Sequence, residues 1–413
     1  MLIGLIAGAA LGGAAHVAAP GAAWLDSLVR YVTDPIGRIF LRLLFMLVIP
    51  LIVTALSLGV AGLGDLRRLG RIGVLTLVYT VIVSSLAVLI GVTLVNWVRP
   101  GAGFDPADLA TLGARAAAAP AASAPSASGI DLLVNIVPNN AVKAMADGDM
   151  LALMFFSLFL GIGLAATPGE AARRLEEGLQ GLNDVVMRLL GMVIQVAPLA
   201  VACLLFTLTA RLGYDVLAKL GAYVAVVVGA LAIQQFGVYS AAVAWFGGMS
   251  PLRFFRGSRA AMLTAFSTAS SNATLPTALL VADRELALPP HVSRFVLTLG
   301  STANQNGTAL FEGVTVLFLA QVFGVELTLA QQVTVVFICI LGGIGTAGVP
   351  AGSIPVVIMI LGLVGIPAEG IGIVLGVDRF LDMCRTTINV TGDLAAAVVV
   401  AHQERHAPGP VAS

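Results

Sequence analysis

The chain has 413 residues, of which 58% are hydrophobic and 11% charged, and its formal net charge at pH 7 is zero. A soluble domain carries about 25% charged residues, so this composition excludes an ordinary water-soluble protein, and the zero net charge indicates no nucleic-acid partner. Apolar runs of about twenty residues recur along the chain and predict an all-α protein that crosses the lipid bilayer several times. The three cysteines lie inside apolar segments, without the spacing of a disulfide framework or a metal site.

The first predicted helices are long and apolar, and they cover residues 2–18, 34–63 and 72–98. Pro50 is expected to bend the second of them. The chain opens on an apolar segment with no basic stretch before it, so we expect a first membrane helix rather than a cleaved signal peptide. After the third helix, an Ala-, Pro- and Ser-rich stretch at 101–130 predicts a flexible linker.

Loop charges predict how the chain is oriented. Further helices are expected over 138–166, 181–211 and 216–247. Arginines gather in three loops that share one side of the membrane if each intervening segment crosses once, namely 67–71, 173–174 and 253–259. The positive-inside rule makes that side the cytoplasm. We therefore expect a multi-pass protein of the cell inner (plasma) membrane with its linker outside.

Two later segments predict re-entrant helical hairpins. Residues 263–282 are apolar at both ends and polar in the middle, and residues 337–364 carry glycine and proline at their centre. Each apolar arm of the first spans about 15 Å of helix, half of a bilayer core of about 30 Å. Between the two, the apolar segment 292–324 is broken by NQNGTA at 304–309. Paired interrupted segments are typical of a transporter binding site at an inverted repeat. Glycines that only permit close helix packing are the alternative, which leaves the neighbouring Asn, Ser and Thr residues unexplained.

The last predicted helix carries a polar stripe in DRFLDMCRTTINVTGD, residues 378–393. At about 100° per residue, its members fall within an arc of about 80°: Asp378, Asp382, Arg385, Asn389 and Asp393. Charges inside a membrane are costly and are expected to face a cavity. Arg385 could hold a carboxylate through two parallel hydrogen bonds, and Asp382 could accept an ammonium group. The alternative is a purely structural Asp–Arg network, which would leave two carboxylates unpaired.

Four motifs follow one another along the C-terminal half: STASSNATLPT, NQNGTALFEG, GTAGVPAGS and DRFLDMCRTTINVTGD. Together they resemble the dicarboxylate/amino acid:cation symporters, the family of archaeal aspartate transporters and eukaryotic excitatory amino acid transporters. Stretches at 40–73 and 136–156 extend the resemblance to nearly the whole chain apart from 101–130. The resemblance implies eight transmembrane helices plus two re-entrant helical hairpins with inverted repeats, a homotrimer, and an elevator-type alternating-access mechanism.

The same resemblance divides the chain into a scaffold, which mediates trimerisation, and a transport domain. The expected segments are 1–70 (scaffold helices 1 and 2), 71–100 (transport-domain helix 3), 101–130 (external flexible linker), 131–212 (scaffold helices 4 and 5), 213–402 (transport domain with helix 6, hairpin 1, helix 7, hairpin 2 and helix 8) and 403–413 (cytoplasmic tail).

The resemblance also implies a substrate site. Arg385 would bind the side-chain carboxylate of the substrate and Asp382 its amino group, and relatives for neutral amino acids lack this arginine. Serines of the first hairpin would contact the substrate, and the tip of the second hairpin would close over it. The residues implied to bind substrate are Arg385, Asp382, Asn389, Thr386, Thr308, Ser270, Ser271, Val349 and Gly352. The family's second, modulatory arginine is absent, since the two positions where it occurs hold Ala269 and Met383.

Three sodium sites are implied by the resemblance, and the third is expected to be weakened. The first would combine the Asp393 carboxylate with backbone oxygens, and the second would use backbone carbonyls alone. The residues implied for these two are Asp393, Asn389, Asn304, Gly300, Thr302, Ile344 and Thr346. At the third, Asn306 stands where the family has an aspartate, Gln305 stands for a methionine and Val83 for a hydroxyl ligand. Hard cations prefer charged or carbonyl oxygens; a sodium ion held by the amide oxygen of Asn306 is the alternative.

A candidate proton carrier lies on the same helix face. Glu312 follows Thr308 and Asn304 by four and eight residues. By resemblance it matches the glutamate assigned as proton carrier in the eukaryotic transporters. We therefore expect fewer coupled sodium ions than usual in the family, with protons in their place.

The expected function is secondary active symport: the import of glutamate or aspartate, small-molecule substrates, coupled to Na+ and/or H+. An enzyme is not expected, because VTGD is not a GxGD protease motif and neither HExxH nor GxSG occurs. A channel is disfavoured by two gated hairpins. A C4-dicarboxylate or a neutral amino acid:cation symporter of the same fold remains the alternative.

Overall fold

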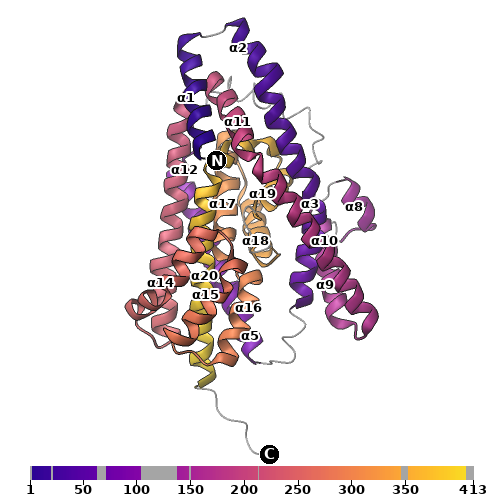
Figure 1. Ribbon diagram of the computed structural model, residues 1–413, viewed down its shortest axis with the longest axis vertical. Helices are drawn as coiled ribbons and strands as arrows, with labels where there is room; N and C mark the ends of the chain where they lie inside the picture. Colours follow the sequence, from indigo (N-terminus) through magenta and orange to yellow (C-terminus); the bar gives the residue numbers. More distant parts are fainter. Residues whose placement is uncertain are drawn as a thin grey trace, which may run out of the picture.

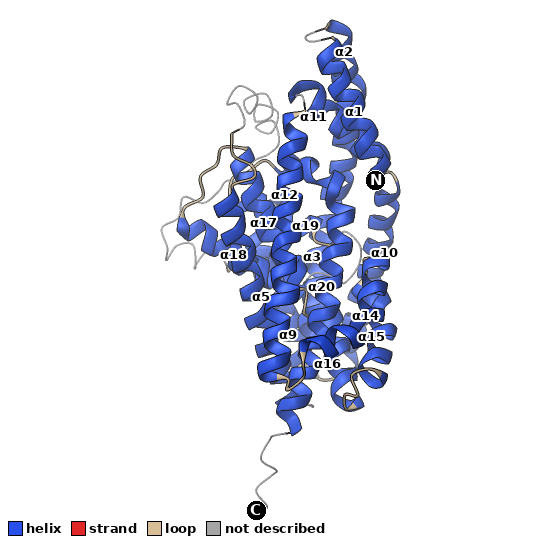
Figure 2. Cartoon of the chain, turned by 90° about the vertical axis from the view of Figure 1, so that its left-hand side faces the viewer, coloured by secondary structure: helices blue, strands red, loops and turns tan. Residues whose placement is uncertain are grey.

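The computed structural model describes the chain over residues 2–19, 22–62, 71–103, 137–147, 150–212, 214–345 and 352–405. Every regular element in these ranges is a helix, as Figure 2 shows, which confirms the all-α prediction. The predicted linker lies outside the described residues from position 104 onward, and the predicted tail does so from position 406 onward.

The N-terminal helices agree closely with the sequence prediction. They are α1 (Leu2–Ala18), α2 (Ala23–Leu28), η1 (Val29–Thr33), α3 (Asp34–Gly62) and α5 (Arg71–Val98). α3 continues as one helix through Pro50, whose carbonyl oxygen accepts a hydrogen bond of 2.9 Å from the Thr54 hydroxyl. This is the side-chain bond that a threonine inside a helix commonly makes to the carbonyl four residues earlier. The acceptor that Pro50 leaves without its usual backbone donor is the carbonyl of Met46, since the proline has no N–H.

Two predicted helices in the middle of the chain have the wrong limits. The stretches 138–166 and 181–211 belong to four helices, α8 (Ala141–Asp147), α9 (Met150–Ala166), α10 (Glu170–Gln195) and α11 (Ala197–Leu212). α10 begins at Glu170 because its polar first turns are rich in good helix formers and are bridged by exposed ion pairs such as Arg174–Glu170. The chain bends by 49° between α10 and α11, next to Pro198, which has no N–H to continue the ladder.

Two helices within the described residues are long and apolar enough to cross a membrane, Arg71–Val98 and Ala218–Phe246. The second runs through α12 (Asp215–Ala232), η3 (Ile233–Val238), α13 (Tyr239–Ala241) and η4 (Ala242–Phe246). Each carries a tryptophan in its last turn, Trp97 and Trp245, with side chains 80% and 79% exposed. Exposed tryptophans at helix ends are typical of the membrane–water interface. The total of eight spans stays a prediction.

The first predicted hairpin is a pair of packed helices, α14 (Pro251–Thr268) and α15 (Ser271–Arg284). Its first arm begins at Pro251 rather than at 263, after Ser250, whose hydroxyl oxygen caps the helix. The chain reverses at Ala269, which adopts the left-handed conformation with φ 51°. Ser270 then caps α15 by accepting a hydrogen bond of 3.2 Å from the backbone N–H of Ala273. The polar centre of the segment therefore builds the turn, and re-entry into the membrane stays a prediction.

The broken segment and the second hairpin occupy the next helices, α16 (Pro290–Ala303), α17 (Asn306–Val322), α18 (Leu329–Gly345) and α19 (Ile354–Leu363). The break between α16 and α17 falls on Asn304 and Gln305 and is narrower than the predicted 304–309. α18 and α19 are the arms of the second hairpin, and 346–351 between them lies outside the described residues.

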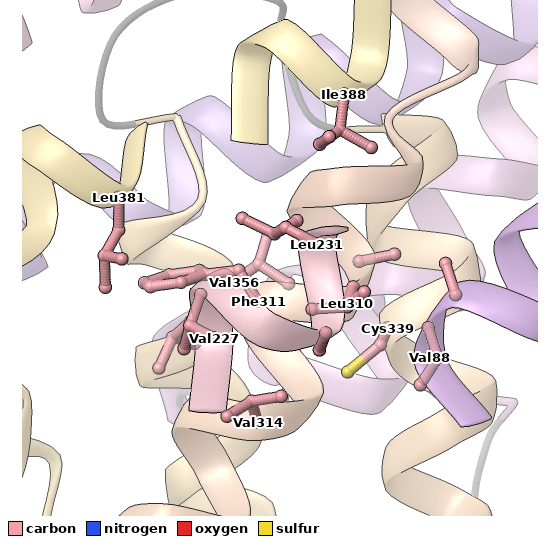
Figure 3. Packing of buried hydrophobic residues seen from close by; sticks show 14 of the residues in the cluster. Val88, Val227, Leu231, Leu310, Phe311, Val314, Cys339, Val356, Leu381 and Ile388 are labelled. Carbon is pink, nitrogen blue, oxygen red and sulfur yellow. The ribbon is translucent and has the colours of Figure 1, made fainter. Parts of the chain in front are cut away.

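α17 and α20 (Ile371–Arg405) form the centre of the C-terminal half (Figure 1). In Figure 3, α17 is surrounded by apolar side chains from neighbouring helices, among them Val88, Val227, Cys339 and Val356. The apolar face of α20, which carries Leu381 and Ile388, is buried as well, with exposures of 0% and 5%. α17 is thus enclosed by protein, and α20 is enclosed over most of its length, so polar groups on their buried faces must find partners inside.

Candidate functional site

The polar stripe of α20 faces the protein interior, as its spacing predicts. Its five members are at most 4% exposed: Asp378, Asp382, Arg385, Asn389 and Asp393. Arg385, at 1% exposed, is the bulkiest fully buried side chain in the described part of the molecule. A buried charge is tolerated only where it is paired and hydrogen-bonded, so the partners of this guanidinium define the site.

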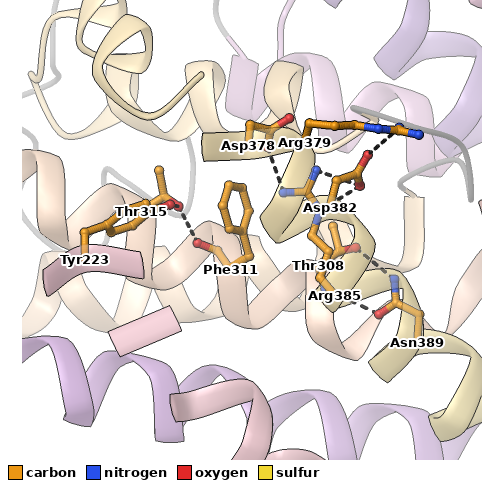
Figure 4. Close-up of polar contacts among 9 residues, drawn as sticks. All are labelled: Tyr223, Thr308, Phe311, Thr315, Asp378, Arg379, Asp382, Arg385 and Asn389. Carbon is orange, nitrogen blue, oxygen red and sulfur yellow. Dashed lines mark hydrogen bonds and ion pairs between the residues drawn. The ribbon is translucent and has the colours of Figure 1, made fainter. Parts of the chain in front are cut away.

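Two aspartates of α20 hold the Arg385 guanidinium (Figure 4). Its Nη1 lies 2.9 Å from Oδ1 of Asp378, while Nε and Nη2 lie 3.1 Å and 3.0 Å from Oδ1 of Asp382. The guanidinium also sits 4.2 Å from the centroid of the Phe311 ring of α17. An Asp–Arg network was expected to leave two carboxylates unpaired. That expectation is wrong, because the short helical spacing lets both Asp378 and Asp382 reach one arginine, and only Asp393 of the stripe lacks a guanidinium partner.

A second arginine reaches Asp382. Nη1 of Arg379 lies 3.8 Å from Oδ2 of Asp382, and the Arg379 side chain is 39% exposed where that of Asp382 is 5% exposed. Figure 4 shows the two guanidiniums approaching the Asp382 carboxylate from different sides. Asp382 is the residue predicted to accept the substrate ammonium group. Each of its two carboxylate oxygens therefore already faces a guanidinium.

Asn389 joins α20 to the start of α17. Its Oδ1 accepts hydrogen bonds from the backbone N–H groups of Gly307, at 2.7 Å, and Thr308, at 3.4 Å. Its Nδ2 donates to Oγ1 of Thr308, at 3.0 Å, and to Oε1 of Gln305. Because the first N–H groups of a helix have no partner within it, an asparagine on the neighbouring helix stabilises the break between α16 and α17.

Asp393, Asn304 and Gly300 meet at the end of α16. Nδ2 of Asn304 donates to Oδ1 of Asp393 at 2.8 Å. A Cβ at Gly300 would lie 2.4 Å from the same carboxylate oxygen, so only glycine allows this approach. Oδ1 of Asn304 is buried and has no hydrogen-bond partner among the described residues. A carboxylate beside an unpartnered amide oxygen fits the oxygen ligands that a hard cation prefers.

Asn306 belongs to a neutral hydrogen-bonded chain. Its Oδ1 accepts a hydrogen bond of 2.6 Å from the Ser84 hydroxyl of α5. Its Nδ2 donates to the Tyr239 hydroxyl at 3.2 Å, and that hydroxyl donates to the backbone oxygen of Ile388 at 3.1 Å. Every partner in this chain is uncharged, and the amide oxygen of Asn306 already accepts one hydrogen bond.

Glu312 is fully buried in α17, and neither of its carboxyl oxygens has a hydrogen-bond partner in the described part of the chain. A buried carboxylate without a partner is costly, whereas the protonated group is neutral. The position therefore suits a carboxyl group that gains and loses a proton.

The hairpin residues are only partly described. Ser271 at the start of α15 and Ser353 before α19 each bury a hydroxyl oxygen without a partner among the described residues. Gly352 is buried, whereas Val349 and Thr346 lie outside the described residues, as does the side chain of Ile344. The remaining predicted residues are placed on the helices around the site, with Thr386 buried in α20 and Thr302 exposed near the end of α16.

Three residues of this site were not predicted from the sequence: Phe311, Arg379 and Tyr239. Phe311 lies three residues after Thr308, and Arg379 three residues before Asp382, so helical spacing could have found both. Tyr239 belongs to an apolar helix and precedes Asn306 by 67 positions in the sequence. Nothing in its local pattern connects it with Asn306.

The chain resembles known proteins over almost its full length. A family model described as the sodium:dicarboxylate symporter family matches residues 1–403. A "Proton/glutamate-aspartate symporter" of Escherichia coli (strain K12) is 33% identical over 409 residues, which cover 98% of this chain and 92% of that protein. A "Proton/sodium-glutamate symport protein" of Bacillus caldotenax is 32% identical over 406 residues, or 98% of this chain and 92% of that protein. A "C4-dicarboxylate transport protein" of Rhizobium etli is 32% identical over 375 residues, which cover 90% of this chain and 83% of that protein.

Proposed function

The chain belongs to the sodium:dicarboxylate symporter family, and from this premise we propose that it is a secondary active symporter that imports glutamate or aspartate with Na+ and/or H+. The observation that carries the proposal is the fully buried Arg385 guanidinium, held by two carboxylates between α17 and α20. The names of two similar proteins, a proton/glutamate-aspartate symporter and a proton/sodium-glutamate symport protein, support the same substrate class and both ions.

Substrate binding would proceed by exchange of carboxylate partners. The side-chain carboxylate of glutamate or aspartate would offer Arg385 two oxygens for parallel hydrogen bonds, in place of the single oxygens with which Asp378 and Asp382 contact the guanidinium. Asp382 would then lose some of its contacts with Arg385, and its carboxylate would accept a hydrogen bond from the substrate ammonium. Thr308, Thr386, Asn389 and the hairpin serines would bind the remaining polar atoms, and Val349 and Gly352 would lie in the closing hairpin.

A C4-dicarboxylate is the second candidate substrate. One relative is a C4-dicarboxylate transport protein, and both oxygens of Asp382 already face guanidiniums. A neutral amino acid fits less well, because it has no second carboxylate to offer Arg385.

The coupling ions would use different groups. Asp393, Asn304 and Gly300 would hold one sodium ion, with Asn389 nearby, and Thr302, Ile344 and Thr346 would supply backbone oxygens for a second. The neutral chain around Asn306 favours a third site too weak to contribute, since no carboxylate compensates a cation there. Glu312 would carry the proton.

The proposed architecture has eight transmembrane helices, two re-entrant hairpins and inverted repeats, assembled as a homotrimer in the inner membrane. Residues 1–70 and 131–212 would form the scaffold, and 71–100 with 213–402 the moving transport domain. The packed helices α14 and α15 and the break between α16 and α17 support this arrangement.

Uptake into proteoliposomes tests the function. Purified protein would be reconstituted and supplied with labelled glutamate, aspartate or succinate under a sodium gradient, a proton gradient, both or neither. We expect concentrative uptake of an acidic amino acid under at least one gradient. Succinate uptake alone would favour the second candidate, and no uptake of any substrate would contradict the proposal.

A further inference from the structure

We propose that Arg379 takes the place of a substrate ammonium at Asp382 and thereby lets one site accept both acidic amino acids and dicarboxylates without an amine. This inference rests on the proposed function and names its substrate range. The two ligand classes share a pair of carboxylates and differ in one positive charge, so the site must compensate Asp382 in both cases.

Charge counting supports this role. Arg385 and Arg379 carry two positive charges, and Asp378 and Asp382 carry two negative ones, so the four side chains sum to zero before any ligand binds. Each oxygen of the Asp382 carboxylate contacts a different arginine: Oδ1 contacts Arg385, and Oδ2 contacts Arg379. A ligand that brings no ammonium leaves the Arg379–Asp382 pair in place. A ligand that brings one competes with Arg379 for Oδ2.

The two pairs differ in how easily they can be displaced. The Arg385 side chain is 2% exposed and makes hydrogen bonds to Asp382 and Asp378. The Arg379 side chain is 39% exposed and its contact is a longer 3.8 Å. Half-exposed ion pairs contribute little to stability, because water competes for the charges. Arg379 is therefore the partner that an incoming ammonium can replace, and its long side chain can turn to solvent.

Without Arg379, Asp382 would behave differently toward the two ligands. An amino acid would still compensate Oδ2 with its ammonium group. A dicarboxylate would bring its two negative charges, without an ammonium, to a site where a buried carboxylate has lost one counter-charge, which is unfavourable. The arginine is thus expected to determine specificity without being required for amino-acid transport.

The test compares aspartate and succinate uptake in proteoliposomes under one gradient. Arg379→Gln should raise the KM for succinate by about two- to fivefold, and should lower the KM for aspartate, whose ammonium no longer competes with Arg379 for Oδ2. Arg379→Met removes the charge and keeps a long side chain, and should behave like Arg379→Gln. Arg379→Lys keeps the charge and should retain succinate uptake.

Arg173→Gln is the matched control, since Arg173 is another exposed arginine in an intrahelical ion pair, 3.6 Å from Glu177 in α10. It should change neither KM. An unchanged ratio of the two KM values in both neutral variants would overturn the inference. So would a wild-type protein that transports aspartate and not succinate, although the proposed function would then stand. A wild-type protein that transports neither would contradict the proposed function itself.

Discussion

The guanidinium carbon of Arg385 lies 4.2 Å from the centroid of the Phe311 ring, and both residues are 1% exposed. A cation over an aromatic face is attracted by the ring quadrupole, by about 2 kcal/mol when both groups are desolvated. The ring belongs to α17 and the guanidinium to α20. This contact therefore fixes the guanidinium relative to the helix that carries Thr308 and Glu312, and Phe311 is a positioning residue for Arg385.

Replacement of the ring should weaken substrate binding. Phe311→Leu keeps an apolar side chain and removes the quadrupole, so we expect the KM for aspartate to rise about three- to thirtyfold. Phe318→Leu is the control in the same helix, because Phe318 stacks on Tyr223 at 4.5 Å and does not touch the guanidinium. An equal rise in KM for both variants would indicate a loss of packing rather than a role in positioning.

Gly307 lies where α17 closely approaches the backbone of α20. A Cβ there would be 2.6 Å from the backbone oxygen of Arg385. Gly307→Ala should therefore destabilise the protein by about 1–3 kcal/mol, seen as a lower melting temperature in detergent. Gly178→Ala in α10 is the control, since nothing lies within 4 Å of its added Cβ. The close contact would be contradicted if the two variants melted at the same temperature as the wild type.

A carboxylate at position 306 should increase the sodium dependence of uptake. Asn306→Asp places a negative charge beside the Ser84 hydroxyl, among oxygens that can hold a hard cation. It also removes the hydrogen bond to Tyr239, at a cost of about 1–3 kcal/mol without sodium. We expect a steeper dependence of aspartate uptake on sodium concentration, and a melting temperature that falls without sodium and recovers with it. Identical sodium dependence in the variant and wild type would count against a weakened third site.

Glu312→Gln should separate the two driving ions. The amide cannot gain and lose a proton, so uptake driven by a proton gradient alone should fall to background while sodium-driven uptake persists. Glu326→Gln is the control, because Glu326 is exposed after the end of α17. Proton-driven uptake that survives in the Glu312 variant would assign the proton to another group.

The sequence predicted the central features of the site because they depend on local geometry. The spacing of the α20 stripe places its five polar residues on one face, and the structure buries that face. The break at Asn304 and Gln305 and the turn at Ala269 and Ser270 lie within the polar interruptions of otherwise apolar segments. In each case a regular pattern, or its interruption, determines the local backbone.

The sequence did not predict contacts that depend on how distant helices pack. The bond between Asn306 and Tyr239 joins residues 67 positions apart, and no periodicity encodes it. The pairing of Arg385 with both Asp378 and Asp382 depends on side-chain rotamers rather than on spacing alone. The sequence predicted a helix from residue 181, whereas α10 begins at Glu170. Its first turns were missed because they are polar, although they are helix-forming and bridged by ion pairs.

The proposed binding step is the exchange by Arg385 of its aspartate partners for a substrate carboxylate. Isothermal titration of purified protein with aspartate in the presence of sodium tests it most directly, with the wild type, Arg385→Lys and Arg385→Gln. Lysine keeps the charge and loses the bidentate geometry, so we predict binding at least about tenfold weaker for Arg385→Lys, and none for Arg385→Gln, with each variant shown to be folded by its melting curve. Folded Arg385→Gln protein that binds aspartate as tightly as the wild type would show that Arg385 does not hold the substrate carboxylate.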